Sequence, residues 1–132
     1  MTLADVPICA FVASAQPERA KAFYSDVLGL RLLKDDGFAL IYRAGGTMLR
    51  VQKGAAGSVT PQRFTVLGWE VEDIEATVDA LTSRGVEFMK VEGLPQDGRR
   101  IWDAGGGDRV CWFHDPDGNT LSLHEGPTAA HP

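Results

Sequence analysis

An internal repeat is the feature of this sequence that most constrains its fold. In residues 7–34 an apolar segment is followed by Gln16, a helical pattern, Gly29 and a second apolar segment. Residues 64–90 repeat that order, with Asp73 and Gly85 at the corresponding positions, 57 and 56 residues further along. Sequence identity between the copies is low, but the residues that begin and end the helix occupy matching positions, as in an old duplication. The repeat predicts two copies of one supersecondary unit.

Each copy contains an amphipathic helix. The first begins near Pro17 and ends at Gly29, residues that suit the first turn and the left-handed exit of a helix. Its apolar stripe has the spacing of one helix face: Ala20, Phe23, Tyr24, Val27 and Leu28. The second begins after Asp73, a good N-cap, and ends at Gly85, with a stripe formed by Ile74, Thr77, Val78 and Leu81. These helices need a sheet on which to pack.

Strands account for most of the remaining chain. A strand is expected after each helix, and further strands are expected at residues 38–43, 47–53, 110–114 and 120–124. The last two are joined by a type I turn and a left-handed glycine, in the sequence Asp115-Pro116-Asp117-Gly118. This turn sets three cross-strand pairs: His114 with Thr120, Trp112 with Ser122, and Val110 with His124. Residues 92–108, rich in glycine and charge, are interpreted as a loop at the edge of a pocket.

Composition excludes several classes of function. The net charge is −5 and Lys and Arg do not cluster, which argues against a nucleic-acid-binding protein. No apolar stretch is long enough to span a membrane, and the N-terminal residues do not form a secretion signal. Cys9 and Cys111 are too few for a disulfide framework and lie in apolar segments. A cytoplasmic location with free thiols is therefore expected.

Three stretches resemble the vicinal-oxygen-chelate superfamily, which contains glyoxalases, bleomycin resistance proteins and ring-cleaving dioxygenases. They are residues 22–30, 68–76 and 112–119, and the resemblance extends over residues 7–125. It implies an α+β fold of two tandem βαβββ units, whose curved mixed sheet surrounds a small-molecule pocket with the helices outside. It also implies a homodimer. We expect one domain over residues 1–126, made of units 5–56 and 62–126, and a flexible tail at 127–132.

Many members of this superfamily bind a divalent metal, and the resemblance assigns its ligand positions to Cys9, Val66 and Ser122. A thiol, a hydrocarbon and a hydroxyl do not make a site for magnesium, manganese, nickel or zinc. His114 and His124 cannot replace them, because about four residue steps at ~3.4 Å separate them along the paired strands. We therefore predict no metal cofactor.

The resemblance keeps the former ligand positions facing the pocket, and strand alternation adds their neighbours. The resemblance also implies a substrate contact near Trp102, which lies in the loop of residues 92–108. The expected lining is apolar and aromatic, which is typical of a site for an organic ligand: Cys9, Phe11, Leu49, Val66, Gly68, Trp102, Val110, Trp112 and Ser122. Ordinary sheet packing of Trp112 and a loop-anchoring role for Trp102 are the alternatives. Trp69 is expected in the core beneath the helices.

Three functions remain open. The first is a metal-free protein that binds a small organic molecule, as the bleomycin-resistance branch does. The second is a metal-independent lyase or isomerase in which Glu70 and His124 transfer protons. The third, a metal-dependent lyase or dioxygenase, is disfavoured by the substitutions at the ligand positions. Glu70 and His124 could instead lie in water at the rim of the pocket.

Overall fold

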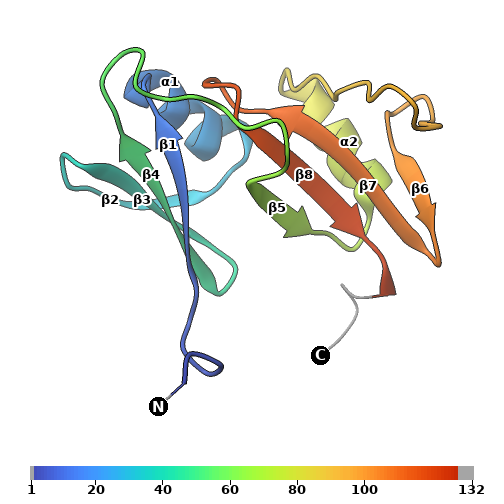
Figure 1. Cartoon of the computed structure of the whole chain (residues 1–132), viewed down its shortest axis with the longest axis horizontal. Coiled ribbons are helices and arrows are strands. Elements are labelled where there is room, and N and C mark those ends of the chain that lie inside the picture. Colours follow the sequence, from blue (N-terminus) through green and yellow to red (C-terminus); the bar gives the residue numbers. More distant parts are fainter. Residues whose placement is uncertain (1, 128–132) are drawn as a thin grey trace. The chain divides into compact units, whose positions relative to one another are not determined.

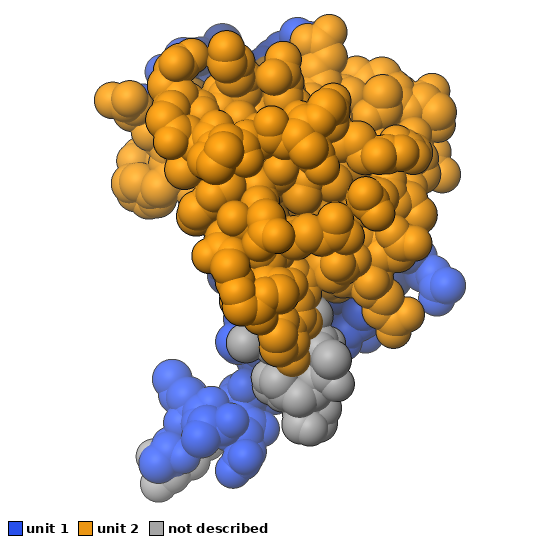
Figure 2. All heavy atoms as spheres, turned by 90° about the vertical axis from the view of Figure 1, so that its right-hand side faces the viewer, with its two compact units in different colours: residues 1–60 blue, residues 61–132 orange. Residues whose placement is uncertain are grey.

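Two four-stranded sheets with the same strand order make up the protein, in a computed structural model that describes residues 2–127 (Figure 1). The chain divides into two compact units, residues 1–60 and 61–132, coloured separately in Figure 2. The first unit contains β1 (Cys9–Ser14), α1 (Pro17–Ala22), the π-helix η1 (Phe23–Val27), β2 (Arg31–Asp35), β3 (Ala39–Ala44) and β4 (Thr47–Lys53). The second contains β5 (Leu67–Glu70), α2 (Ile74–Ser83), β6 (Trp102–Gly105), β7 (Asp108–His114) and β8 (Thr120–Glu125). All but the first residue of the expected tail, 127–132, lies outside the described residues.

The topology confirms the predicted duplication. The sheets have the orders β1-β4-β3-β2 and β5-β8-β7-β6, which are the same arrangement of a βαβββ unit. In both, the first strand pairs in parallel with the last, and the other neighbours are antiparallel. The β7–β8 hairpin has the register predicted from its turn: His114 lies opposite Thr120, Trp112 opposite Ser122 and Val110 opposite His124.

In the first unit, the helical segment packs on β3 through two tyrosines. The rings of Tyr24 and Tyr42 have centroids 6.0 Å apart, and both side chains are fully buried. The Tyr42 hydroxyl lies 2.9 Å from that of Ser25, and burial raises the pKa of Tyr42. The predicted continuous helix widens after its first turns, where the amide of Leu28 donates to the carbonyl of Phe23, five residues earlier.

In the second unit, the core lies between α2 and one face of the sheet. Trp69 stacks on Phe113 with ring centroids 6.4 Å apart; it lies on the predicted face of the sheet but is only half-buried. Phe88 meets Phe113 edge-on at 5.4 Å. Strand alternation sends Trp112 and Ser122, which are neighbours across β7 and β8, to the opposite face. That face carries the cavity described below.

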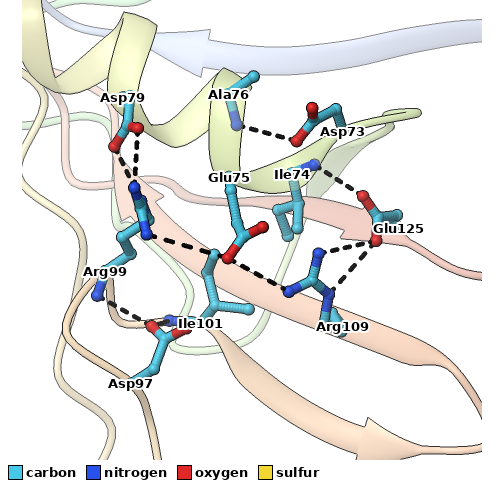
Figure 3. A network of polar contacts seen from close by, with 10 residues as sticks. All are labelled: Asp73, Ile74, Glu75, Ala76, Asp79, Asp97, Arg99, Ile101, Arg109 and Glu125. Atoms are coloured by element: carbon cyan, nitrogen blue, oxygen red, sulfur yellow. Dashed lines mark hydrogen bonds and ion pairs between the residues drawn. The ribbon is translucent and has the colours of Figure 1, made fainter.

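Charged side chains hold α2 on this sheet (Figure 3). Asp73 caps the helix by accepting from the amide of Ala76 at 3.0 Å, as predicted. Glu125 accepts from the amide of Ile74 at 2.8 Å and from Arg109 Nη2 at 3.0 Å. The hydrogen bond from the Ile74 N–H lowers the pKa of Glu125 most, and the hydrogen bond from the Arg109 guanidinium lowers it further. The N-terminus of α2 is thus bonded directly to the end of β8.

The prediction of a strand directly after Gly85 is wrong. Gly85 does end the helix with a positive φ of 96°, as Gly29 does at 73°. After it, however, the chain forms only two isolated bridges before β6, Phe88 with Phe113 and Gln96 with Trp102, and the equivalent of β2 is β6. The segment interpreted as a loop, 92–108, therefore contains a strand. Residues 84–101 are an insertion into the second unit, since three residues, 28–30, make the same connection in the first.

Candidate functional site

A cavity of about 860 Å³ opens on the sheet face opposite α2, entirely within the second unit. Its volume lies within the range of small-molecule sites. Three parts of the chain form it: residues 61–65 before β5, residues 89–94 of the insertion, and residues of β6 and of the β7–β8 hairpin. The full lining is Pro61, Gln62, Arg63, Phe64, Thr65, Met89, Lys90, Val91, Glu92, Leu94, Trp102, Trp112, His114, Gly118 and Thr120.

Two tryptophans form the aromatic wall of the cavity. Trp102 of β6 and Trp112 of β7 are stacked, with ring centroids 6.1 Å apart and planes 24° apart. Inserting a third ring between them would require about 7 Å, two contact layers of ~3.5 Å each. The indoles therefore leave no room for a ligand ring between them, and a ligand can reach only the outer surface of the pair. A planar ligand would stack on that surface.

Gln96 holds the insertion in place as the second wall. Its side-chain oxygen accepts from the amide of Val91 at 2.7 Å. Its Nε2 donates to the carbonyls of Met89 and Arg100, each at 2.9 Å. Asp97 tightens the following turn by accepting from the amide of Ile101 at 2.9 Å. Side-chain hydrogen bonds thus replace the strand ladder that this segment lacks.

The third wall, residues 61–65, is bonded to both strands of the hairpin. The hydroxyl of Thr120 donates to the carbonyl of Gln62 at 3.0 Å. The indole Nε1 of Trp112 donates to the hydroxyl of Thr65 at 3.0 Å. These bonds fix the edge of the cavity and the tilt of one tryptophan.

Of the residues predicted to line a pocket, Trp102 and Trp112 line this cavity. Val110, Ser122 and Gly68 share a sheet face with Trp112, as strand alternation predicted, but lie further along it and outside the cavity. Gly68 has a steric role, because a Cβ there would meet the hydroxyl of Ser122.

The pocket residues predicted in the first unit lie on different faces of its sheet. Cys9 and Phe11 lie on the same face of β1, and both are exposed. Leu49 pairs with Ala10, so it lies on the opposite face of the sheet, where it is 2% exposed. The predicted inward register of Leu49 beside Cys9 and Phe11 is therefore wrong. The cause is the parallel β1–β4 pairing, which sets the parity of β4 and is invisible in a local pattern.

The metal implied by the resemblance does not fit the residues at its positions. Val66 has no donor atom, Ser122 offers a hydroxyl and Cys9 a thiol. Within residues 2–127, no three His, Cys, Asp or Glu side chains are grouped as metal ligands would be. Divalent ions require several oxygen, nitrogen or thiolate donors together.

Glu70 and His124 are neighbours in register on the parallel strands β5 and β8. His124 has a further partner that the sequence did not suggest: its Nε2 lies 3.1 Å from Oδ1 of Asp108. Gly126 makes room for this carboxylate, which a Cβ at that position would overlap. None of the three side chains lines the cavity.

The sequence did not identify the residues contributed by 61–65 and 89–94. The sequence pattern places Lys90 and Val91 at the end of an expected strand. Arg63 and Phe64 show no distinctive pattern and lie at the start of another expected strand. A usable signal was present in Pro95, Gln96 and Gly98, since proline and glycine so close together disfavour a regular strand.

A family model, the Glyoxalase/Bleomycin resistance protein/Dioxygenase superfamily, matches residues 8–123. No curated protein matches the sequence. In the part of the chain that the structure describes, no helix has the length and apolarity needed to span a membrane.

Solved structures share the fold at low sequence identity. A Bacillus anthracis protein, provisionally named a glyoxalase family protein, is 16% identical with a TM-score of 0.75, over 96% of this chain and 98% of its own. TnmS3, an antibiotic binding protein from Streptomyces sp. CB03234, is 22% identical with a TM-score of 0.68, over 96% and 99%. Lactoylglutathione lyase from Agrobacterium tumefaciens is 20% identical with a TM-score of 0.61, over 96% and 98%. At these identities the likeness establishes the fold of two tandem βαβββ units.

Proposed function

The chain belongs to the glyoxalase, bleomycin resistance protein and dioxygenase superfamily, and on that basis we propose that it is a small-molecule-binding protein whose ligand is planar and aromatic. The ligand stacks on the outer surface of the Trp102–Trp112 pair. The observation that carries this proposal is the stacked pair itself, which lines a cavity of about 860 Å³. Aromatic side chains offer a large contact area at low entropic cost.

The remaining lining supports a binding role. Phe64, Met89, Val91 and Leu94 extend the apolar surface around the tryptophans. Apolar walls with a few fixed polar groups are the usual make-up of a site that encloses an organic molecule. The fold also serves a binding protein in TnmS3, named as an antibiotic binding protein.

The proposed binding requires no divalent metal. The residues at the expected ligand positions, Cys9, Val66 and Ser122, do not provide a set of hard or imidazole donors. After dialysis against zinc, nickel, manganese and iron(II) and then against buffer, we expect less than about a tenth of an equivalent of each metal. Near-stoichiometric retention of one metal would overturn this part of the proposal.

Binding is tested by titration with naphthalene-2-carboxamide, a neutral planar probe, followed through the indole N–H signals in heteronuclear NMR. Signals of Trp102 and Trp112 should shift saturably, while that of Trp69, stacked on Phe113 in the core, should not. Trp102→Leu should weaken binding about tenfold, the scale of losing one aromatic anchor. Trp69→Phe is the matched control and should keep the affinity. Unchanged binding in Trp102→Leu would refute the proposed site.

A second function is favoured by the pairing of His124 with Asp108. A carboxylate that holds an imidazole orients it for proton transfer, and Glu70 adjoins His124 on the neighbouring strand. A metal-independent lyase or isomerase would use Glu70 and His124 in this way. Glu70→Gln and His124→Asn should then abolish conversion of a bound ligand, whereas a binding protein would lose little. Because these groups lie outside the cavity, we favour the binding function.

A further inference from the structure

The net charge of the residues that line the cavity differs in sign from that of the protein as a whole. Arg63 and Lys90 contribute positive charge, and Glu92 is the one acidic residue among the lining residues. The lining therefore carries one excess positive charge, whereas the chain carries a net charge of −5. A cationic site on an acidic protein concentrates anions locally against the overall field.

The two cations come from two different segments of the lining. Arg63 belongs to residues 61–65, which are bonded to the hairpin through Thr65 and Thr120. Lys90 belongs to the insertion, between Met89 and Val91, whose backbone groups are both bonded to Gln96. The backbone that carries each cation is thus held by hydrogen bonds. Arg63 and Lys90 line the same cavity as Trp102 and Trp112.

Neither cation has an acidic partner within residues 2–127, unlike the arginines on the other side of the unit. Arg99 forms an ion pair with Asp79 at 2.9 Å, and Arg109 pairs with Glu125 at 3.0 Å (Figure 3). Those charges are neutralised by the network that anchors α2. The positive charge at the cavity remains available to a ligand.

From this arrangement we propose that the ligand is a planar aromatic carboxylate. Its ring system stacks on the outer surface of the Trp102–Trp112 wall, and its carboxylate is bound by Arg63 and Lys90. A guanidinium can donate two parallel hydrogen bonds to a carboxylate, and an ammonium adds a point charge. One excess positive charge matches a single carboxylate better than a polyphosphate. This inference rests on the proposed binding function and specifies its ligand class.

Three isosteric probes separate charge from shape: naphthalene-2-carboxylate, naphthalene-2-carboxamide and naphthalene-2-carboxamidine. They share the ring system and differ in being anionic, neutral and cationic. Affinities are measured by isothermal titration at low ionic strength, with the indole signals of Trp102 and Trp112 confirming the site. The carboxylate should bind most tightly and the amidine most weakly. Each exposed cation is expected to contribute about two- to fivefold, and added salt should reduce the preference.

Charge variants identify the residues responsible. Arg63→Gln and Lys90→Gln should each reduce carboxylate affinity about two- to fivefold and reduce carboxamide affinity less. The double variant should lose the preference for the carboxylate over the carboxamide, because only the negative charge of Glu92 then remains in the lining. Glu92→Gln is the matched control, since it removes the opposing charge from the same lining and should strengthen carboxylate binding.

The outcomes separate this inference from the binding function on which it rests. If the unsubstituted protein binds the carboxylate and the carboxamide with equal affinity, the proposed preference for an anion is wrong. The proposal that an aromatic ligand stacks on the two tryptophans would be unaffected. A preference for the carboxylate that survives the double variant would remove Arg63 and Lys90 from their proposed role. If none of the three probes shifts the Trp102 and Trp112 signals, both the inference and the binding proposal fail.

Discussion

The indole nitrogen of Trp112 donates a 3.0 Å hydrogen bond to the hydroxyl of Thr65, 47 positions earlier in the chain. The bond joins β7 to the segment that precedes β5, and it fixes the ring that stacks on Trp102. Satisfying the polar end of a half-buried tryptophan leaves its apolar surface to face the cavity.

Removing this acceptor should loosen the wall. Thr65→Val keeps the shape of the side chain but leaves the indole N–H without its partner, so we expect a loss of about 0.5–1.5 kcal/mol in stability. The indole proton of Trp112 should shift in NMR and exchange faster with solvent. Thr65→Ser, which keeps the hydroxyl, is the control and should retain the bonded indole signal. An unshifted Trp112 signal in Thr65→Val would contradict the bond.

The insertion should depend on Gln96. Gln96→Leu removes hydrogen bonds to the backbone at Met89, Val91 and Arg100, leaving polar groups unpaired at a cost of about 1–3 kcal/mol. We expect faster hydrogen exchange at the Val91 amide and weaker binding of naphthalene-2-carboxamide, with the core around Phe113 intact. Gln96→Glu keeps the acceptor for the Val91 amide and loses the N–H groups that bond Met89 and Arg100. Its exchange rate and its binding should therefore lie between those of the unsubstituted protein and those of Gln96→Leu. Unchanged exchange at Val91 would show that the wall is held by other contacts.

The α2 anchor should give an acid-dependent stability. The pKa of Glu125 is lowered from its ordinary 4.5, so its stabilising contribution is present above that pH and is lost as pH falls through the folded-state value. Glu125→Gln should therefore lower the urea midpoint at neutral pH, and the difference from the unsubstituted protein should shrink below pH 4.5. Glu87→Gln, at an exposed carboxylate of the same unit, is the control. A difference that stays constant between about pH 7 and about pH 3 would count against the ionised Glu125 as the anchor.

The two thiols should differ sharply in reactivity. Cys9 is exposed, whereas Cys111 is fully buried and its pKa is raised by burial to about 12. Because thiol reagents attack the thiolate, Cys9 should react rapidly with a chromogenic disulfide and Cys111 only on unfolding. Cys9→Ser should abolish the fast phase and leave the slow one. A fast phase in Cys9→Ser would mean that β7 opens locally.

Local chemistry explains why much of the fold could be predicted. The β7–β8 register followed from the turn at residues 115–118, because loop length and a left-handed glycine fix which residues face each other. Asp73 was identified as an N-cap and Gly85 as a helix end for similarly local reasons. These features depend on residues within a few positions of one another, so the sequence carries them directly.

The sequence by itself determined the duplicated fold, the position of the core helices and the β7–β8 register that places Trp112 opposite Ser122. Only the structure placed Trp102 on a strand, because the sequence had indicated a loop there. Only the tertiary structure decided the parity of Leu49, which the parallel pairing with β1 sets, and the course of residues 84–101. It also decided that Arg63 and Lys90 meet at one cavity while Arg99 and Arg109 are neutralised elsewhere. The physical reason is the distance along the chain between interacting residues. The partner of a strand and the neighbours of a charged side chain are set by contacts between distant segments, and a local sequence pattern does not constrain these contacts.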